Sequence, residues 1–408
     1  MKILYIVPYT PTPIRTRPYN LLRNLARQGH QITLATVWEN SVEQQQLEQF
    51  RESGIEVLAE RLGRAQITQN LASALLNRKP LQSKYSWQPN LAIQIENKLS
   101  KYYPHCDIIQ IEHLRGAVFG LYLLKKFSNR LPRQPILWDS VDNISALFQQ
   151  AVQHSDQRFG RWITRFELPL TRRYEADLTG RFERILVTSP VDQEAFKTLA
   201  DNSNHQTRID VLSNGVDLEA FSPPDSPRLP NTIVFSGKLS YHANVSSANY
   251  LVEQVMPIVW ARRPQVRVQL VGKDPHPSLI SLAEQEPRVE VTGTVPDIRP
   301  YLQAASLTAA TLTYGAGVQN KVLEAMACAT PVVTTTRAVS ALGVVAGQDV
   351  LVSDEPAGLA EHIVQLLEDQ DYNHRIGENG LRYVRRNHDW NKIARDLTTI
   401  YEDIIHPS

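Results

Sequence analysis

Short runs of apolar, mostly β-branched residues alternate with amphipathic segments along the whole chain. Such runs predict strands that are buried on both faces, and the amphipathic segments between them predict crossover helices. The first half contains seven predicted strands, at residues 3–7, 32–36, 55–58, 108–111, 136–138, 185–188 and 209–212. This alternation is typical of a doubly wound α/β sheet with parallel strands and helices on both faces.

The pattern stops at a proline-rich segment, residues 221–231, and then starts again. Proline fixes φ and has no N–H to donate, so four prolines between 223 and 230 cannot continue a sheet or a helix. The predicted strands of the second half are residues 233–235, 266–271, 289–291, 306–311, 331–334 and 350–352. We therefore predict two Rossmann-like domains, residues 1–221 and 222–389, and a last helix at about 390–408 that could pack back on the first.

Composition narrows the class of protein. The 408 residues include 43 Lys+Arg and 42 Asp+Glu, a balance that argues against a dedicated nucleic-acid binder, which needs a basic excess. The two cysteines, Cys106 and Cys328, lie too far apart in sequence for a cysteine-rich metal site and fit a reducing compartment. The apolar runs are too short to span a bilayer, and the first residues do not resemble a signal peptide. We expect a cytoplasmic protein, which could lie at the inner face of the membrane.

The loop after the first strand contains no glycine. A dinucleotide fingerprint needs glycines where the backbone approaches a pyrophosphate, so this loop argues against a nicotinamide or flavin dehydrogenase. It leads instead to Arg15 and Arg17, at the start of the first helix. Because ligands of such sheets bind at the carboxyl ends of the strands, both arginines are candidates for an acceptor or phosphate contact. The alternative is that they are solvated surface residues.

Three further polar residues follow strands of the first half. His113 comes directly after one strand, and Asp139 and Asp142 end the next. A histidine at a strand's carboxyl end can face a ligand, although a single histidine is more often structural. None of these groups has the spacing of a zinc site, so no metal is expected.

In the second half, glycines follow three predicted strands. Gly237 precedes Lys238, Gly272 ends the second strand, and Gly293 is followed by Thr294 and Val295. Each glycine alone is a weak signal, because glycine is common in turns. Together they outline the floor of a ligand site at one edge of the sheet.

Residues 314–333 predict a small-residue loop, a helix of eight to ten residues, a tight turn and a buried strand. A loop such as that at Gly317 leaves N–H groups unpaired at the positive end of the helix dipole, which favours a phosphate group. Lys321 and Glu324 are three residues apart and therefore share one face of this helix. The alternative is an ordinary surface ion pair.

Together these residues resemble the retaining glycosyltransferases of family 4, whose GT-B fold consists of two Rossmann-like domains that face a central cleft. The resemblance covers nearly the whole chain. It depends most on residues 214–217, 235–237, 291–297, 320–327 and 331–333. Residues 317–324 and 139–142 look most like the sugar transferases associated with exosortase and exopolysaccharide gene clusters.

The resemblance implies roles by position. Glu324 matches the glutamate that binds the donor ribose, and Thr294 and Val295 match main-chain contacts to the nucleobase. His113 matches a histidine that reaches the donor sugar, and Arg17 matches a polar contact of the first helix. The donor loop, where the backbone meets the sugar and the pyrophosphate, corresponds to Gly317, Val318, Gln319 and Asn320.

Two departures from the family pattern concern charge. The position eight before Glu324 is often a second glutamate in the family, and here it is Ala316. The position five after Lys238 is a lysine in many members, and here it is Ala243. In the related exopolysaccharide enzymes a residue like Lys321 is expected to contribute the missing phosphate charge. We therefore regard Lys321, His113 and Lys238 as the candidate catalytic residues.

The resulting expectation is a metal-independent, retaining glycosyltransferase without a cofactor. It would use a nucleotide-diphosphate sugar, and its acceptor would be a glycan, a lipid-linked sugar or a small molecule in polysaccharide or glycoconjugate synthesis. The alternatives are a non-catalytic nucleotide-sugar-binding or partner protein, which the alanine at 316 favours, and a nucleotide-sugar epimerase.

A basic amphipathic segment suggests a membrane as a further partner. Apolar residues at 159, 162, 163 and 166 recur at helical spacing among five arginines between 158 and 173. Such a segment can rest on an anionic membrane surface. The alternative is a long helix that covers the first sheet, and the interleaved acids at 167, 175 and 177 dilute its charge.

Overall fold

The computed structural model describes residues 1–102, 106–128, 134–154, 158–203, 207–314 and 317–406, with side chains described except at 101, 102, 151, 153, 154 and 158–163. The chain divides into two compact units. Unit 1 comprises Met1–Ser213 and Trp390–Ser408, and unit 2 comprises Asn214–Asp389. Each unit is an α/β structure around one parallel sheet.

The first unit contains seven strands, each at a position where the hydrophobic pattern predicts one. Its elements are β1 (Lys2–Val7), α1 (Thr16–Arg27), β2 (Gln31–Trp38), α2 (Ser41–Glu52), β3 (Glu56–Arg61), α3 (Arg64–Leu76), α4 (Gln82–Tyr85), α5 (Pro89–Tyr102), β4 (Ile108–Glu112), α6 (His113–Lys126), β5 (Ile136–Val141), α7 (Ile144–His154), α8 (Arg158–Thr179), β6 (Arg184–Val187), α9 (Pro190–Asp201), β7 (Arg208–Val211) and α18 (Trp390–Ile405).

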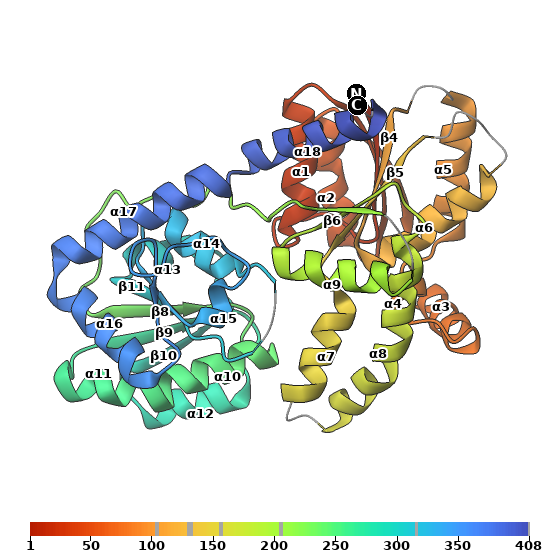
Figure 1. The fold of residues 1–408 in the computed structure, drawn as a ribbon. Coiled ribbons are helices and arrows are strands. Elements are labelled where there is room, and N and C mark those ends of the chain that lie inside the picture. The colour runs from red at the N-terminus through yellow and green to blue at the C-terminus, as the bar shows by residue number, and fades with distance from the viewer. Residues whose placement is uncertain (103–105, 129–133, 155–157, 204–206, 315–316, 407–408) are drawn as a thin grey trace. The chain divides into compact units, whose positions relative to one another are not determined.

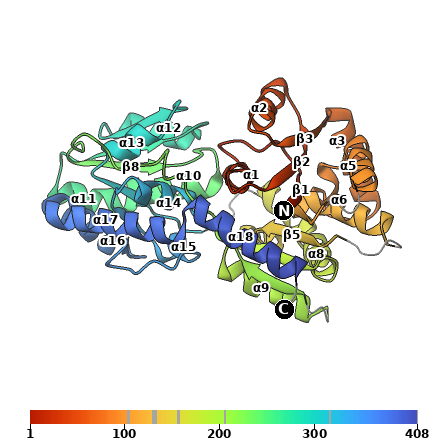
Figure 2. The same ribbon diagram turned by 90° about the horizontal axis from the view of Figure 1, so that it is seen from above.

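The sheet of unit 1 has the strand order β3-β2-β1-β4-β5-β6-β7, with parallel pairing throughout. Helices α1, α2 and α18 bury apolar side chains on one face, and α5, α6 and α9 do so on the other. In Figure 2, α5 and α6 lie on the side of the sheet away from α1. The strand order reverses between β1 and β4, so this is the topological switch point at which doubly wound sheets bind ligands.

The C-terminal helix α18 is part of unit 1 and packs against α1. Trp390, Ile393 and Leu397 lie in the same apolar core as Leu21 and other side chains of α1. One buried polar contact fixes the helix further, because the Tyr401 hydroxyl donates to Gln110 Oε1 in β4. The last helix is therefore held by core packing and by a hydrogen bond to the central sheet.

The second unit contains six strands, again where the pattern predicts them. Its elements are β8 (Thr232–Ser236), α10 (His242–Tyr250), the short π-helix η1 (Leu251–Val255), α11 (Met256–Arg262), β9 (Arg267–Val271), α12 (Pro277–Gln285), β10 (Val289–Gly293), α13 (Arg299–Ala304), β11 (Leu307–Ala310), α14 (Asn320–Ala327), β12 (Val332–Thr334), α15 (Thr336–Val339), β13 (Leu351–Val352), α16 (Pro356–Glu368) and α17 (Gln370–Asn387).

The sheet of unit 2 repeats the same parallel topology in the order β10-β9-β8-β11-β12-β13. Helices α10, α11 and α12 cover one face, and α13 and α14 cover the other (Figure 1). The switch point lies between β8 and β11. The helix that carries Lys321 and Glu324 is α14, which begins at Asn320 and spans eight residues, as the small-residue loop before it predicts.

The division between the units lies at 213/214 and 389/390, rather than at 221/222 as the proline cluster suggested. The reason is that the segment after Ser213 packs within unit 2. Val216 is buried in the core around α14, and its N–H donates to His388 O at 2.8 Å. Farther on, Arg228 donates to Gln303 O at 2.8 Å and to Cys328 O at 2.8 Å. The proline-rich segment is therefore a packed part of unit 2, and it does not connect the two units.

Within the part of the chain that the structure describes, none of the helices combines the length and the apolar character that a bilayer span requires.

Candidate functional site

Lys321 is bent back against the carboxyl end of β8, the first strand of unit 2. Its ammonium donates to Asn244 Oδ1 of α10 at 2.6 Å and lies 4.7 Å from the centroid of the Phe235 ring. The Asn244 amide also donates to Lys238 O at 3.0 Å. Burial lowers the pKa of Lys321 to about 8, with Glu324 acting in the opposite sense. A half-buried cation at the end of this strand is placed to bind an anion.

Gly237 and Gly272, which follow β8 and β9, have neighbouring atoms so close that a larger residue would not fit at either position. A Cβ at Gly237 would lie 2.8 Å from Asn244 Nδ2 and 3.4 Å from Lys321 Nζ. A Cβ at Gly272 would lie 1.7 Å from Gly237 O, a backbone atom that cannot move aside. The two glycines therefore bring β8 and β9 together and leave room for the lysine and the asparagine.

Glu324 lies one turn farther along α14 than Lys321 and is half-buried. Burial raises its pKa to about 7, and Lys321 opposes that rise. Its carboxylate makes no hydrogen bond or ion pair to the described residues within bonding distance, so it is not the partner of a surface ion pair. Both of its oxygens can accept hydrogen bonds from a ligand's hydroxyl groups.

The N-terminus of α14 has no side-chain cap. Gln319 occupies the N-cap position, and its side chain donates weakly to Gly317 O at 3.4 Å instead. Asn320 Oδ1 is buried and has no hydrogen-bond partner among the residues that the structure describes. Val318 packs against the core near α14. Ala316, the position that the resemblance marks as a missing glutamate, lies outside the described residues.

The remaining predicted donor residues lie at the same edge of the sheet. Lys238 is exposed, and its ammonium has no partner among the described side chains. Gly293, the last residue of β10, has φ +68°; after it, Thr294 is exposed and Val295 is half-buried against the core. The structure thus brings the glycine turns, Lys321 and Glu324 to the carboxyl ends of adjacent strands, as the sequence predicts.

His113 lies at the junction of β4 and α6 in unit 1, beside the switch point. Its φ is +62°, which is uncommon outside glycine and marks a locally strained backbone. The Arg115 N–H donates to its Nδ1 at 3.3 Å, which leaves the proton on Nε2. Burial, followed by the charge of Arg115, lowers its pKa to about 3. His113 is therefore a neutral imidazole that can donate a hydrogen bond from Nε2.

Two residues beside His113 were not found from the sequence. The buried Glu112 carboxylate accepts from the hydroxyls of Tyr5 at 2.8 Å and Tyr9 at 2.6 Å. Burial and the nearby Asp139 raise its pKa to about 7, and the two tyrosines oppose that rise. The Tyr9 ring meets the His113 ring edge-on, with 6.2 Å between centroids. Tyr9 and Glu112 therefore pack the loop after β1 against His113.

Arg17 and Asp139 were expected to contact a ligand, but the structure pairs them with each other. Arg17 Nε lies 3.0 Å from Asp139 Oδ2, and its Nη1 donates to Leu212 O at 2.9 Å. The two side chains are 4% and 0% exposed. Both are enclosed in the protein, so the prediction that they contact an acceptor or a phosphate is wrong. Spacing could not reveal this, because the partners are 122 residues apart.

Arg15 and Asp142 are also engaged by protein groups. Arg15 forms an ion pair with Glu43 at 3.2 Å and lies 4.9 Å from the Tyr9 ring centroid, yet 39% of its side chain is exposed. Asp142 accepts from Thr188 Oγ1 at 3.3 Å. Burial and the neighbouring Asp192 raise its pKa to about 6. Of these two, Arg15 remains accessible to a ligand.

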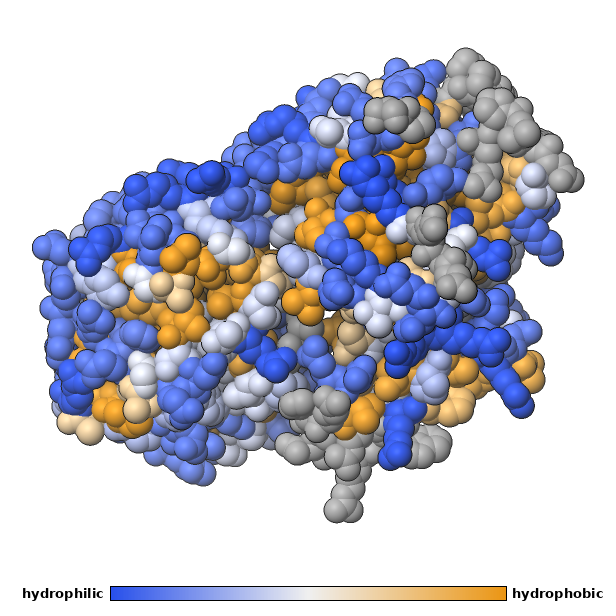
Figure 3. All heavy atoms as spheres, in the orientation of Figure 1, coloured by the Kyte–Doolittle hydropathy of each residue, from blue (hydrophilic) through white to orange (hydrophobic). Residues whose placement is uncertain are grey.

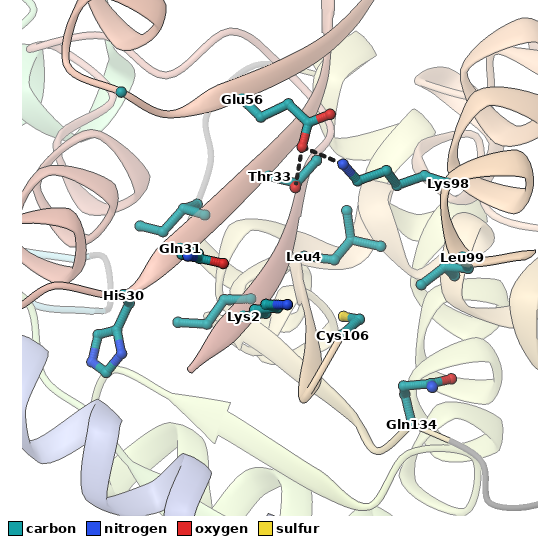
Figure 4. Close-up of a pocket in the computed structure, with 13 residues that line it drawn as sticks. Lys2, Leu4, His30, Gln31, Thr33, Glu56, Lys98, Leu99, Cys106 and Gln134 are labelled. Carbon is teal, nitrogen blue, oxygen red and sulfur yellow. Dashed lines mark hydrogen bonds and ion pairs between the residues drawn. The ribbon is translucent and has the colours of Figure 1, made fainter. Parts of the chain in front are cut away.

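A pocket of about 450 Å³ lies elsewhere in unit 1, at the amino ends of β1 and β2. Figure 4 shows Lys2, His30, Gln31, Glu56, Lys98 and Cys106 around it. The Lys98 ammonium and the Thr33 hydroxyl both bind Glu56, so the charges on this wall are paired with each other. None of the predicted site residues lines this pocket, because they follow the opposite ends of the strands.

Among the described residues, no cluster of three or more His, Cys, Asp or Glu side chains is placed to hold a metal ion.

The comparison with protein families bears on unit 2. Residues 230–369 match the family described as Glycosyl transferases group 1. Over this range unit 2 is similar to that family. The match covers β8 to α16, the segment that carries Lys238, Lys321 and Glu324. No curated protein matches the sequence.

Solved structures show the fold of the whole chain. Sucrose-phosphate synthase from Thermosynechococcus elongatus is 17% identical, with a TM-score of 0.68 and coverage of 100% of both chains. HepE from Anabaena, in complex with UDP, is 19% identical, with a TM-score of 0.69 and coverage of 99% of this chain and 100% of HepE. A glycosyltransferase from Rickettsia africae is 15% identical, with a TM-score of 0.68 and coverage of 100% of this chain and 99% of the Rickettsia chain. At these identities the likeness concerns architecture, and it establishes that the chain has the GT-B fold.

Proposed function

We propose that this protein is a retaining, metal-independent glycosyltransferase that transfers a sugar from a nucleotide-diphosphate donor. The observation that carries the proposal is the Lys321 ammonium at the carboxyl end of β8, with the carboxylate of Glu324 on the same helix, where no described residue binds it. The ammonium of Lys321 is suited to bind the diphosphate, and the carboxylate of Glu324 is suited to accept hydrogen bonds from two ribose hydroxyls. The glycosyltransferase group 1 match over the same residues supports this assignment.

The proposed chemistry needs little acid–base catalysis, because a sugar 1-diphosphonucleotide is already activated. An acceptor hydroxyl forms the new bond to the sugar C1, and the electron pair of the C1–O bond leaves on the diphosphate. The hydroxyl proton passes to the departing phosphate or to water. Lys321, Lys238 and the uncapped N-terminus of α14 would stabilise the charge that develops on the leaving group, since fixed donors need no reorganisation.

The remaining roles rest on the resemblance to family 4. Main-chain groups at Thr294 and Val295 would contact the nucleobase, residues 317–320 the diphosphate and sugar, and the His113 Nε2–H a sugar hydroxyl. The HepE structures with UDP and with UDP-glucose favour a uridine donor as the first one to test. Retention of the anomeric configuration rests on the resemblance to family 4, and NMR assignment of the product linkage tests it.

The acceptor class is proposed to be a glycan, a lipid-linked sugar or a small molecule, in exopolysaccharide or other glycoconjugate synthesis. In the basic segment considered for membrane contact, the side chains of residues 158–163 lie outside the described residues. In its described part, Phe166 is 53% exposed and Arg165, Arg172 and Arg173 are exposed. Glu167 and Glu175 are buried and accept from the N–H groups of Leu81 and Ile144, whereas Asp177 is exposed beside the arginines.

Neighbouring side chains extend the basic surface of α8. Lys79 lies 5.9 Å from the Tyr174 ring of α8, and Leu75 and Leu76, at the end of α3, are 53% and 85% exposed. Figure 3 shows hydrophobic side chains among strongly hydrophilic ones in the region of α3. This mixture is suited to peripheral contact with an anionic bilayer at the cytoplasmic face. Flotation with anionic and with neutral vesicles tests it, and equal recovery from both would contradict it.

Incubation with a panel of nucleotide sugars, with and without acceptor lipids or oligosaccharides, tests the function. Acceptor-dependent release of the nucleotide is the expected result, and it should persist in excess chelator. Conversion of one nucleotide sugar into another would identify an epimerase instead. Binding without any turnover would identify a non-catalytic nucleotide-sugar-binding protein.

A further inference from the structure

Asn244 connects the two lysines of the proposed phosphate site. It lies on α10 and is 8% exposed. Its Nδ2 donates to Lys238 O at 3.0 Å, and its Oδ1 accepts from Lys321 Nζ at 2.6 Å. The first bond fixes the orientation of the amide, so that the oxygen, and not the nitrogen, faces the ammonium.

The position of Lys321 depends on this contact. A lysine side chain has a flexible four-carbon stem, and a free one would extend into solvent. Here the ammonium lies over Phe235 and beside Gly237, where any side chain would crowd it. Among the described residues, Glu324 is the charged group that raises its pKa, and the two form no ion pair within 4 Å. The amide of Asn244 therefore determines where the charge lies.

The neighbouring residue explains why the cation comes from α14. Ala243, where the resembling transferases have a lysine, is 1% exposed and packs with Leu312 and Ala338. A charged side chain at 243 would have to enter that apolar cluster, at a large desolvation cost. In this chain α10 presents a neutral acceptor at 244, and α14 presents the cation.

We propose that Asn244 is a positioning residue that fixes the Lys321 ammonium at the end of β8 for the donor diphosphate. A neutral amide takes one of the three N–H donors and leaves the positive charge uncompensated. A carboxylate at 244 would neutralise that charge and repel a phosphate. The role toward the diphosphate rests on the proposed function, whereas the contact itself does not.

Competitive labelling of lysines with acetic anhydride, read by mass spectrometry across pH, tests the contact without any substrate. Asn244→Asp should slow labelling of Lys321 below pH 10, because the carboxylate raises the pKa of the ammonium. At about pH 11, where the amine is largely deprotonated whether it is buried or exposed, Asn244→Ala should speed labelling at least about threefold, because it releases the side chain. The matched control is Asn373→Ala, whose amide also binds two carbonyls of unit 2. Labelling of Lys321 that is unchanged in both Asn244 variants would overturn the proposal.

A double-mutant cycle on donor kcat/KM tests the role. Asn244→Ala should lower kcat/KM about tenfold or more, and Lys321→Ala by about two to three decades. If Asn244 acts through Lys321, the kcat/KM of the double variant should lie within about threefold of that of Lys321→Ala. A double variant whose loss in kcat/KM equals the product of the two single losses would overturn the proposal. If the proposed function is wrong, the unaltered protein will turn over no nucleotide sugar. The labelling experiment uses no substrate, so its result does not depend on that outcome.

Discussion

The Arg17 guanidinium and the Asp139 carboxylate meet at two points inside unit 1. Nε lies 3.0 Å from one carboxylate oxygen, and Nη2 lies 3.1 Å from the other. Burial would lower the pKa of Arg17, but Asp139, Tyr5 and Glu112 together outweigh it and the pKa is raised. Because Nη1 also donates to Leu212 O, the pair connects α1 with β5 and with the end of β7. The buried ion pair therefore stabilises the carboxyl-end edge of the sheet near the switch point.

Removing one partner of this pair should strongly destabilise unit 1. Asp139→Leu leaves an arginine that cannot lose its proton buried without its counter-ion, and a cost of about 3–5 kcal/mol is expected. The double variant Arg17→Met/Asp139→Leu should be less destabilised than Asp139→Leu alone. Urea denaturation followed by circular dichroism measures both. The control is Arg15→Met, which breaks a partly exposed ion pair and should cost about 1 kcal/mol or less. Equal midpoints for Asp139→Leu and Arg15→Met would contradict the prediction.

Lys321 and Glu324 should differ in kinetics. Phosphate oxygens gain charge as the C1–O bond breaks, so Lys321→Ala should lower kcat, by about 3 kcal/mol in activation free energy, while nucleotide binding remains measurable. Ribose hydroxyls do not change charge, so Glu324→Ala should mainly raise KM, and Glu324→Gln should be milder. Since the pKa of Lys321 is about 8, donor binding to the free enzyme should weaken as pH rises through 8.

Steady-state kinetics over pH 6–10 measures these effects, with Lys197→Ala as the control. Lys197 is an exposed lysine of α9 whose loss should leave both constants unchanged. A near-normal kcat in Lys321→Ala would show that the lysine does not contact the leaving group.

Three glycines of unit 2 should respond differently to alanine. Gly272→Ala places a Cβ 1.7 Å from Gly237 O and should prevent stable folding of unit 2. Gly237→Ala displaces the side chains of Asn244 and Lys321, so it should impair donor turnover more than stability. Gly347→Ala meets no atom within 4 Å and should cost only about 1–2 kcal/mol for its φ of +80°. Melting temperatures and donor KM distinguish the three. A melting temperature of Gly272→Ala as high as that of Gly347→Ala would refute the close approach.

His113 should act as a neutral hydrogen-bond donor at every physiological pH. With its pKa near 3, no ionisation of this residue should be visible in the pH profile of kcat around 6.5. His113→Ala should lower donor turnover by about two decades without changing the affinity for UDP. His113→Gln places an N–H close to the original Nε2 and should restore part of the turnover. Titration calorimetry measures the affinity for UDP, and a turnover assay measures the rate at which the donor sugar is consumed. A parallel loss of UDP affinity would show that the histidine acts on the fold and not on the sugar.

The amino-acid sequence by itself determined the elements and the glycine turns. Alternating apolar runs predicted every strand of both sheets, because a strand buried on both faces must be apolar along its length. The loop before α14 predicted its uncapped N-terminus, and the spacing of Lys321 and Glu324 placed both on one face of that helix. These are local properties, which neighbouring residues along the chain decide.

Only the tertiary structure decided which polar groups satisfy one another. Arg17 lies 122 residues from Asp139, and Lys321 lies 77 residues from Asn244, so each contact depends on the order of the strands and on the helices that cover them. The same holds for the boundary at 213/214, which burial of Val216 fixes although the prolines lie later. A sequence pattern records whether a residue is buried, but a buried charge requires a partner, and the identity of that partner is a property of the folded chain.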